Sequence, residues 1–303
     1  MSIVVANLTK EYGIQKAVND VSFSVNKGEI VGFIGPNGAG KSTTMKIITG
    51  YIRNFTGTVE VNGLDLSKNL IEVKRQIGYL PEHNPLYLEM YVREYLRFVA
   101  GVHKLGKESV QRINDVIELT GLGLEQKKKI SSLSKGYRQR VGLASTLVHD
   151  PSVLVLDEAT TGLDPNQIIE IRNLIATVGK EKTVLLSTHI MQEVEAICHK
   201  VIIINKGKIV MDDKSENVNS HSTSIQQIVF AEFSNSIDIK SLTTINGIIE
   251  VRNVEANKWI LVGNGLVDIR PLIFECAVTL SNQVISLHEQ HKSLEDVFRE
   301  ITK

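Results

Sequence analysis

Apolar residues follow one pattern before about residue 212 and another after it. In the first part, short apolar runs alternate with stretches in which apolar residues recur at helical spacing. The runs predict buried strands at 29–34, 152–156 and 183–187. The stretches that follow them predict helices at 43–49, 166–178 and 191–198. This alternation is typical of an α/β fold with a largely parallel sheet.

The segment 86–148 interrupts this alternation. It contains no strong strand run, and it has helical patterns at 92–102 and 110–120. We therefore predict a mostly helical insertion within the first domain.

Four aromatic residues of the insertion recur at spacings that predict one helix face. They are Tyr87, Tyr91, Tyr95 and Phe98. Ordinary core packing explains such a face most simply. In a second interpretation, part of the face lines a groove for a partner protein.

A polar stretch marks the boundary between the two parts of the chain. Between residues 212 and 224 the only sizeable apolar side chain is Val218, so this stretch cannot bury a face. We predict a first domain at 1–212, a linker at 213–224 and a second domain at 225–303.

The second domain is predicted to be a small α+β domain. Its pattern gives strand, helix, strand, strand, helix and strand, which is the β-α-β-β-α-β order of a ferredoxin-like fold. The expected ranges are 225–232, 237–244, 247–253, 258–262, 267–276 and 284–288. A last helix is expected at 294–301, where Ser293 begins a sequence with the form of a capping box.

Composition excludes several classes of protein. The chain has 34 Lys+Arg and 34 Asp+Glu, so it lacks the excess positive charge of a nucleic-acid binder. No apolar run approaches the length of a membrane span, and the first residues lack the pattern of a secretory signal. Cys198 and Cys276 form no metal-binding spacing. We therefore expect a soluble protein of a reducing compartment that binds no nucleic acid.

A glycine-rich segment carries the strongest chemical signal. Between a predicted strand and a predicted helix it fits G-x-x-x-x-G-K-[ST], with Gly35, Pro36, Asn37, Gly38, Ala39, Gly40, Lys41, Ser42 and Thr43. Backbone N–H groups of such a loop surround the phosphates of a nucleotide. We predict that Lys41 meets the β- and γ-phosphates and that the Ser42 hydroxyl binds Mg²⁺.

Three polar residues follow the other predicted strands. Asp157 and Glu158 come after 152–156, and His189 comes soon after 183–187. Carboxyl ends of parallel strands share one edge of a sheet, so these side chains should lie near Ser42. We predict that Asp157 holds the metal, that Glu158 deprotonates the attacking water, and that His189 donates to the γ-phosphate.

A further helix is predicted to begin after Ser134. Ser134 resembles an N-cap, and Gly136 lets the backbone at the helix start approach an anion. Most serines and glycines in such places are only caps. The place of this segment shortly before the strand at 152–156 makes it a more specific signal.

Together, these motifs resemble those of the ATP-binding cassette (ABC) family over residues 3 to about 212. The glycine-rich loop matches its Walker A motif, residues 133–139 its signature, 153–158 its Walker B motif, and His189 its switch histidine. The resemblance implies a P-loop fold with a RecA-like core, an antiparallel β-subdomain and a helical subdomain.

The resemblance also implies roles for residues outside the main motifs. Tyr12 stands where the family stacks an aromatic ring on adenine, with Val18 beside it. Asp164 falls in the D-loop, near the nucleotide. Glu82 takes the Q-loop position, where an oxygen coordinates Mg²⁺.

Two residues depart from the most common family pattern. Lys135 replaces a glycine of the signature, and Glu82 replaces a glutamine. Both are similar to the ABC-2-type export ATPases, as is the ending at 293–302. Within that group the chain most resembles the ATPase subunits of gliding-motility transporters of Bacteroidota.

The family resemblance implies a mechanism and partners. Two cassettes, either two copies or a copy and a paralogous cassette, sandwich two ATP molecules, and hydrolysis lets them part. A separate integral membrane permease would carry out export and dock a short helix in the groove between 82 and 98. The chain would then lie in the cytoplasm, peripheral on the cytoplasmic face of the inner membrane.

Two alternatives stay open from the sequence. The chain could be a soluble ABC ATPase acting on the ribosome or on nucleic acid, although it has one cassette, no heptad arm and an even charge. It could also be a non-catalytic regulatory nucleotide binder, although Lys41, Asp157, Glu158 and His189 are all present.

Overall fold

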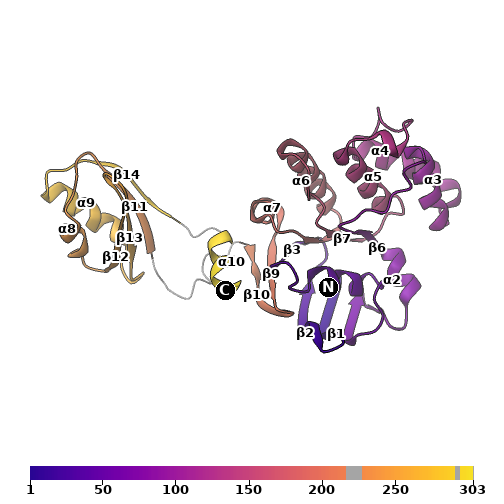
Figure 1. Ribbon diagram of the computed structural model, residues 1–303, viewed down its shortest axis with the longest axis horizontal. Helices are drawn as coiled ribbons and strands as arrows, with labels where there is room; N and C mark the ends of the chain where they lie inside the picture. Colours follow the sequence, from indigo (N-terminus) through magenta and orange to yellow (C-terminus); the bar gives the residue numbers. More distant parts are fainter. Residues whose placement is uncertain (216–226, 291–293, 303) are drawn as a thin grey trace. The chain divides into compact units, whose positions relative to one another are not determined.

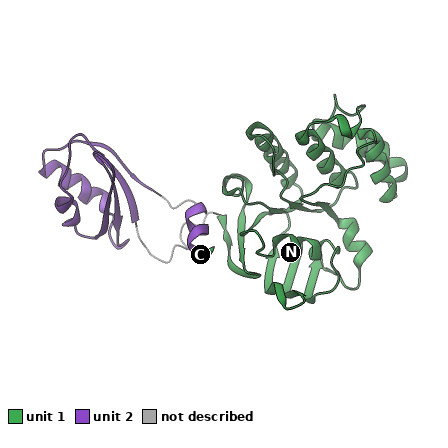
Figure 2. Ribbon diagram, in the orientation of Figure 1, with its two compact units in different colours: residues 1–216, 301–303 green, residues 217–300 purple. Residues whose placement is uncertain are grey.

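Two separate hydrophobic cores organise the chain. The computed structural model describes residues 1–215, 227–290 and 294–302 (Figure 1). One unit comprises residues 1–216 with 301–303, and the other comprises 217–300 (Figure 2). Among the described residues, no helix is both long enough and apolar enough to cross a membrane.

A six-stranded sheet forms the centre of the first unit. Its order is β10-β9-β3-β8-β7-β6, with β10 antiparallel to β9 and the other neighbours parallel. The strands are β3 (Ile30–Ile34), β6 (Ile77–Leu80), β7 (Val153–Asp157), β8 (Thr183–Ser187), β9 (Lys200–Asn205) and β10 (Lys208–Lys214). Every residue of β3, β7 and β8 is buried, which explains why these strands have apolar runs rather than alternation. The predicted parallel α/β fold is confirmed.

Helices follow the central strands as predicted. They are α1 (Lys41–Ile48) after β3, α6 (Pro165–Gly179) after β7 and α7 (Met191–Ile197) after β8. Asp164 caps α6 by accepting a hydrogen bond from the Gln167 N–H at 2.9 Å, and Pro165 occupies the first turn. The chain therefore turns into each helix at the carboxyl end of a strand.

A four-stranded antiparallel sheet shares the core of the central sheet. Its strands are β1 (Ile3–Tyr12), β2 (Gln15–Val25), β4 (Thr56–Val61) and β5 (Leu64–Asp65), in the order β2-β1-β4-β5. Helix α2 (Leu70–Gln76) then leads into β6. This sheet is the antiparallel β-subdomain that the family resemblance implies.

Helices occupy most of the chain between β6 and β7. They are α3 (Val92–Val102), η1 (Gly106–Glu108), α4 (Ser109–Leu119), η2 (Ile130–Ser132) and α5 (Lys135–Leu147). The predicted single aromatic face is wrong, because α3 begins only after Tyr91. Tyr87 instead folds back onto the helix, with its ring 6.2 Å from that of Tyr95 and 5.5 Å from that of Phe98.

The second unit has the predicted order of elements. They are β11 (Gln227–Phe233), α8 (Ile239–Thr243), β12 (Ile248–Glu255), β13 (Lys258–Gly263), α9 (Ile269–Thr279) and β14 (Val284–Glu289). The sheet order β12-β13-β11-β14 is antiparallel throughout, as in a ferredoxin-like fold. Val229, Ala231 and Phe233 of β11 form a core with Ile269 and Ile273 of α9. Helix α10 (Leu294–Thr302) ends the described chain.

The predicted linker at 213–224 begins too early. Asp213 and Lys214 still belong to β10, where they pair with Val201 and Lys200. Sheet pairing keeps these polar residues in the strand although they bury no apolar face. Residues 216–226 and 291–293, which include the predicted linker from 216 to 224 and Ser293 of the predicted capping box, lie outside the described residues.

The core of the second unit can be tested through Trp259, the single tryptophan of the chain. Trp259 and Phe233 are buried in the same cluster. We expect Phe233→Ala to lower the free energy of unfolding of this unit by about 3–5 kcal/mol, because it leaves a cavity. Denaturant titrations followed by Trp259 fluorescence measure this change. Phe233→Leu should cost less, and an unchanged midpoint in the alanine variant would contradict the assigned core.

Candidate functional site

The site is assembled at one edge of the central sheet. Parallel pairing of β3 with β8 and of β8 with β7 brings their carboxyl ends together. The glycine-rich loop leaves β3, Asp157 ends β7, and His189 follows β8. The predicted site residues therefore lie at one edge of the sheet because β3, β8 and β7 pair in parallel and in register.

The glycine-rich loop curls tightly because its neighbours leave no room for side chains. A Cβ on Gly35 would lie 2.3 Å from the carbonyl oxygen of Ile204. Gly40, the N-cap of α1, has φ 111°, and a Cβ there would lie 2.4 Å from the carbonyl oxygen of Ala17. Only glycine fits at these two positions. The remaining loop residues, Pro36, Asn37, Gly38 and Ala39, connect them, and Ser42 and Thr43 lie in the first turn of α1.

Lys41 points back into the loop that precedes it. Its ammonium donates to the carbonyl oxygens of Gly35 at 2.7 Å and Pro36 at 3.2 Å. Burial lowers the pKa of Lys41, whereas the charges of Glu158, Asp157 and Glu82 raise it. The lysine thus lies within the field of three of the four predicted acidic site residues.

Three predicted metal ligands line one cavity of about 500 Å³, namely Ser42, Glu82 and Asp157. Asp157 is 1% exposed, and its Oδ1 has no hydrogen-bond partner. Burial raises the pKa of Asp157, and hydrogen bonding from Ser42 opposes that rise. A buried carboxylate oxygen without a partner beside a hydroxyl is a suitable donor set for a hard cation.

These donors fit Mg²⁺ better than a metal enclosed by protein ligands alone. Among the described residues, no group of three or more His, Cys, Asp or Glu side chains could hold a metal ion. Mg²⁺ is commonly bound through one or two carboxylates, with water and phosphate oxygens completing its shell. Ser42 and Asp157 could therefore hold Mg²⁺ together with a nucleotide.

Glu158 is held in an unusual backbone conformation directly after β7. Its φ is 53°, in the left-handed region, and its N–H donates to the Ser187 carbonyl oxygen at 2.9 Å. Such a conformation is costly for a residue with a side chain, and it persists only where surrounding contacts fix it. The hydrogen bond to Ser187 of β8 is one of these contacts.

Two side chains meet the same oxygen of Glu158. The Thr161 hydroxyl donates to Oε2 at 2.9 Å, and Nδ1 of His189 lies 2.6 Å from it. The Glu158 side chain is only 10% exposed, whereas that of His189 is 56% exposed. The structure thus brings Glu158 and His189 into direct contact, with one side of the histidine open to solvent.

The signature residues contact the start of α6 rather than the glycine-rich loop. Ser134 is the N-cap of α5, as expected, and accepts from the Tyr137 N–H at 3.4 Å. A Cβ on Gly136 would lie 2.5 Å from the Gln167 side chain. Among the described residues, no hydrogen bond joins Ser134 or Gly136 to the loop that holds Lys41.

The two residues predicted to meet adenine differ in accessibility. Tyr12, at the end of β1, is 51% exposed, and the Lys10 ammonium lies 4.8 Å from its ring centroid. Val18 is completely buried in the core of the first unit. In this conformation Val18 offers no surface to a nucleotide, because its side chain is needed between the two sheets.

The sequence assigned no role to Thr161, and it placed Gln139 at the end of the signature without assigning it a contact. Gln139 of α5 donates to the Ala159 carbonyl oxygen at 2.8 Å, which ties the signature helix to the segment after Glu158. The signature pattern includes Gln139 but does not say which backbone group it contacts. The only local signal for Thr161 is its place three residues after Glu158, within reach of a tight turn.

Comparison with known proteins identifies the family. Residues 18–161 match the family model described as ABC transporter. The chain is 34% identical over 308 residues to the uncharacterized ABC transporter ATP-binding protein YhcH of Bacillus subtilis (strain 168), covering 98% of this chain and 94% of the relative. The chain belongs to the ABC transporter ATP-binding protein family.

Two further matches each cover about seven tenths of this chain. The bacitracin transport ATP-binding protein BcrA of Bacillus licheniformis is 40% identical over 210 residues, covering 69% of this chain and 68% of the relative. A solved structure of an ATP-binding subunit of an ABC transporter has a TM-score of 0.66 and 31% identity, covering 73% of this chain and 92% of that chain. The predicted ABC ATPase fold and an ATP-binding, ATP-hydrolysing function are confirmed, whereas the narrower resemblance to gliding-motility transporters stays a prediction.

The contact from Thr161 to Glu158 gives a test of the site. We expect Thr161→Val to lower the turnover number for ATP about 10- to 100-fold, because a hydrogen bond to a charged group contributes about 1.5–3 kcal/mol. Thr161→Ser keeps a hydroxyl and should retain most of the activity. Steady-state ATPase assays on the purified chain measure both variants. Full turnover in the valine variant would show that Thr161 does not position Glu158.

Proposed function

We propose that this ABC ATPase is the energy-coupling subunit of an exporter whose membrane-spanning part is a separate permease. The observation that carries the ATP-hydrolysing part of the proposal is the contact between Glu158 and His189 beside Lys41 and Asp157. Such a cluster is suited to activating water next to bound phosphates. It also argues against a non-catalytic regulatory role.

Each residue of the cluster has a proposed role. Lys41 meets the β- and γ-phosphates, and Ser42 and Asp157 hold Mg²⁺, with Glu82 at the edge of the same cavity. Bound Mg²⁺ neutralises phosphate charge. Glu158 accepts the proton of the attacking water, while His189 holds Glu158 and faces the γ-phosphate.

The complete site is proposed to require a second cassette. In this chain Ser134 caps α5, and Gly136 lies against the Gln167 side chain of α6. Neither residue is hydrogen-bonded to the loop of Lys41 among the described residues. A second copy, or a paralogous cassette, would supply these residues and Asp164 to the outer side of the nucleotide. With one Walker A motif and one signature in the chain, two copies can complete two sites through isologous contacts.

The exporter assignment rests on Lys135, Glu82 and the resemblance to ABC-2-type export ATPases. It places the chain in the cytoplasm, on the inner face of the membrane, in contact with the permease. A role in gliding motility is the narrower form of this proposal. The even charge of 34 basic and 34 acidic residues supports a partner other than nucleic acid.

Glu158→Gln tests the proposed general base. We expect ATP binding to persist and turnover to fall about 100-fold or more, the usual contribution of a general base. ATP should then hold the chain as a dimer in size-exclusion chromatography. Glu118→Gln, which changes an exposed glutamate of α4, is the matched control and should hydrolyse ATP normally. Undiminished turnover in Glu158→Gln would remove Glu158 from the base role.

Detergent extraction from the native cells tests the exporter proposal. The affinity-tagged chain should co-purify with an integral membrane protein in a fixed ratio, and reconstitution of the pair should couple ATP hydrolysis to transport. Co-purification with ribosomes or nucleic acid, and with no membrane protein, would instead favour the soluble alternative.

A further inference from the structure

Glu193 is a buried acidic residue outside the cluster of Lys41, Asp157, Glu158 and His189. It belongs to the first turn of α7 and is only 2% exposed. Among the described residues its carboxylate accepts one hydrogen bond, and its Oε1 is buried without a partner. Removing a carboxylate from water for a single hydrogen bond destabilises a fold. A buried group of this kind therefore points to a role beyond stability.

Two hydrogen bonds in series join Glu193 to the backbone on both sides of His189. The Thr188 hydroxyl donates to Oε2 of Glu193 at 2.9 Å, and its oxygen accepts from the Ile190 N–H at 3.1 Å. A hydroxyl can donate one bond and accept another, so the two bonds are compatible. Because Thr188 and Ile190 are the chain neighbours of His189, this series, which we call the relay, holds the chain before and after the histidine.

The relay takes the place of an ordinary cap at the start of α7. Ile190 is the N-cap, and an isoleucine side chain cannot accept a hydrogen bond from the first turn. In a capping box, a glutamate three residues after the N-cap accepts directly from the N-cap N–H. Glu193 holds that position, but the Thr188 hydroxyl lies between its carboxylate and the Ile190 N–H. The cap is thereby attached to the residue that precedes His189.

The relay is anchored on the central sheet through α7. Val194, the neighbour of Glu193, is completely buried. A Cβ on Gly32 of β3 would lie only 2.8 Å from Cγ1 of Val194, so the helix packs closely on this strand. The carboxylate of Glu193 therefore has a fixed place relative to the sheet, from which it can hold the segment that carries His189.

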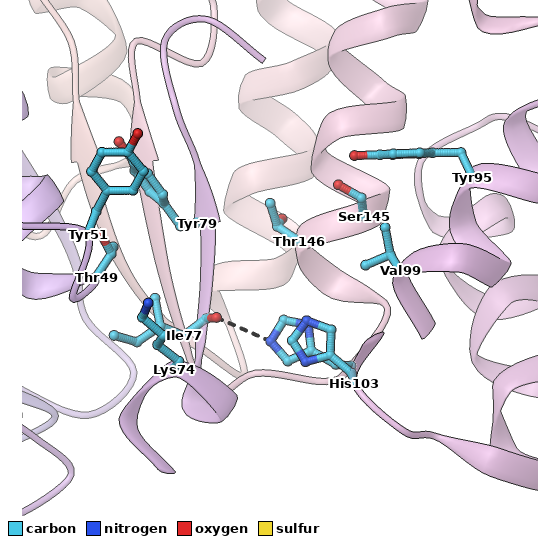
Figure 3. A pocket seen from close by; sticks show the side chains of 11 residues that line it. Thr49, Tyr51, Lys74, Ile77, Tyr79, Tyr95, Val99, His103, Ser145 and Thr146 are labelled. Carbon is cyan, nitrogen blue, oxygen red and sulfur yellow. Dashed lines mark hydrogen bonds between the residues drawn. The ribbon is translucent and has the colours of Figure 1, made fainter. Parts of the chain in front are cut away.

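The ring of His189 depends on that segment for its position. Its side chain is 56% exposed, and its one hydrogen bond among the described residues is the 2.6 Å contact of Nδ1 with Glu158. His149 is held differently, because its ring stacks on His103 and its Nε2 lies 3.2 Å from the Ile77 carbonyl oxygen (Figure 3). A ring without such neighbours is directed mainly by the backbone that carries it.

We propose that Glu193 is a positioning residue for ATP hydrolysis, which acts through Thr188 to hold His189 against Glu158. This inference rests on the proposed roles of His189 and Glu158. The relay keeps Nδ1 of His189 on the carboxylate of Glu158, so that the open side of the ring faces the γ-phosphate. Loss of the relay frees the ring from Glu158 and leaves the loop of Lys41 unchanged.

Removal of the Thr188 hydroxyl tests the relay. We expect Thr188→Val to lower the turnover number for ATP about 10-fold or more, because displacing a catalytic group by about 1 Å can cost about 100-fold. The dissociation constant for ATP should not change, since the glycine-rich loop is intact. Thr188→Ser keeps the hydroxyl and should retain most of the turnover. Steady-state ATPase assays and calorimetry on the purified chain measure both quantities.

Thr120→Val is the matched control for Thr188→Val. Both threonines are completely buried, but the Thr120 hydroxyl donates to the Val116 carbonyl oxygen at the end of α4, outside the site. The control should therefore hydrolyse ATP as the wild type does. Equal losses in the two valine variants would assign the effect to a lost buried hydroxyl and overturn the relay.

Glu193→Gln tests the other end of the relay. Its amide oxygen can still accept from the Thr188 hydroxyl but has no charge, so turnover should fall less than in Thr188→Val. Because the two residues act in one series of bonds, the double variant should be no slower than Thr188→Val alone. Independent, multiplying losses would contradict the relay.

A His189→Ala background separates positioning from a general structural effect. Single-turnover assays measure the slow hydrolysis that remains, and Thr188→Val should lower it no further once His189 is absent. An equal fold-loss in both backgrounds, or full turnover in Thr188→Val alone, overturns the relay and leaves the proposed roles of His189 and Glu158 intact. Undiminished turnover in His189→Ala itself overturns the proposed role of His189 and this inference with it.

Discussion

The parallel pairing of β3, β8 and β7 is the constraint on which the rest of the structure depends. The register places Ile34 beside β9 and aligns Asp157 with Ser187, so the loops after the three strands emerge at one edge. These strands can be parallel only because helices cross back between them and cover their buried faces. The short, uninterrupted apolar runs and the cluster of charged residues are thus two consequences of one arrangement.

Strain and charge are concentrated where this edge meets the helical segment. Glu158 has a left-handed backbone, and its carboxylate is held by Thr161 and His189. Lys41 is held by the carbonyls of its own loop although three acidic side chains attract it. A site fixed in this way by surrounding contacts needs little rearrangement to orient water, which is the advantage of a preorganised site.

Two side chains link the catalytic edge to surfaces where partners are proposed. Gln139 joins the signature helix to the segment after Glu158, and Tyr79 lines the cavity of Asp157 and Glu82. Because packed side chains transmit small displacements, a second cassette at α5 would affect the segment that follows Glu158. This arrangement gives a physical route by which partner binding can be sensed at the nucleotide.

The sequence by itself determined the three central strands β3, β7 and β8, the helices that follow them and the chemistry at their ends. Burial on both faces requires apolar runs, and a phosphate loop requires glycines and a lysine at fixed spacing. The buried strands and the loop can therefore both be recognised from the local sequence. Tertiary structure alone decided that Val18 is buried, that Tyr87 folds back onto α3, and that Gln139 of α5 reaches the segment after Glu158. It also decided that Lys74 shares a cavity with His103 and His149. These contacts depend on which distant segments pack together, and periodicity within one segment carries no information about that.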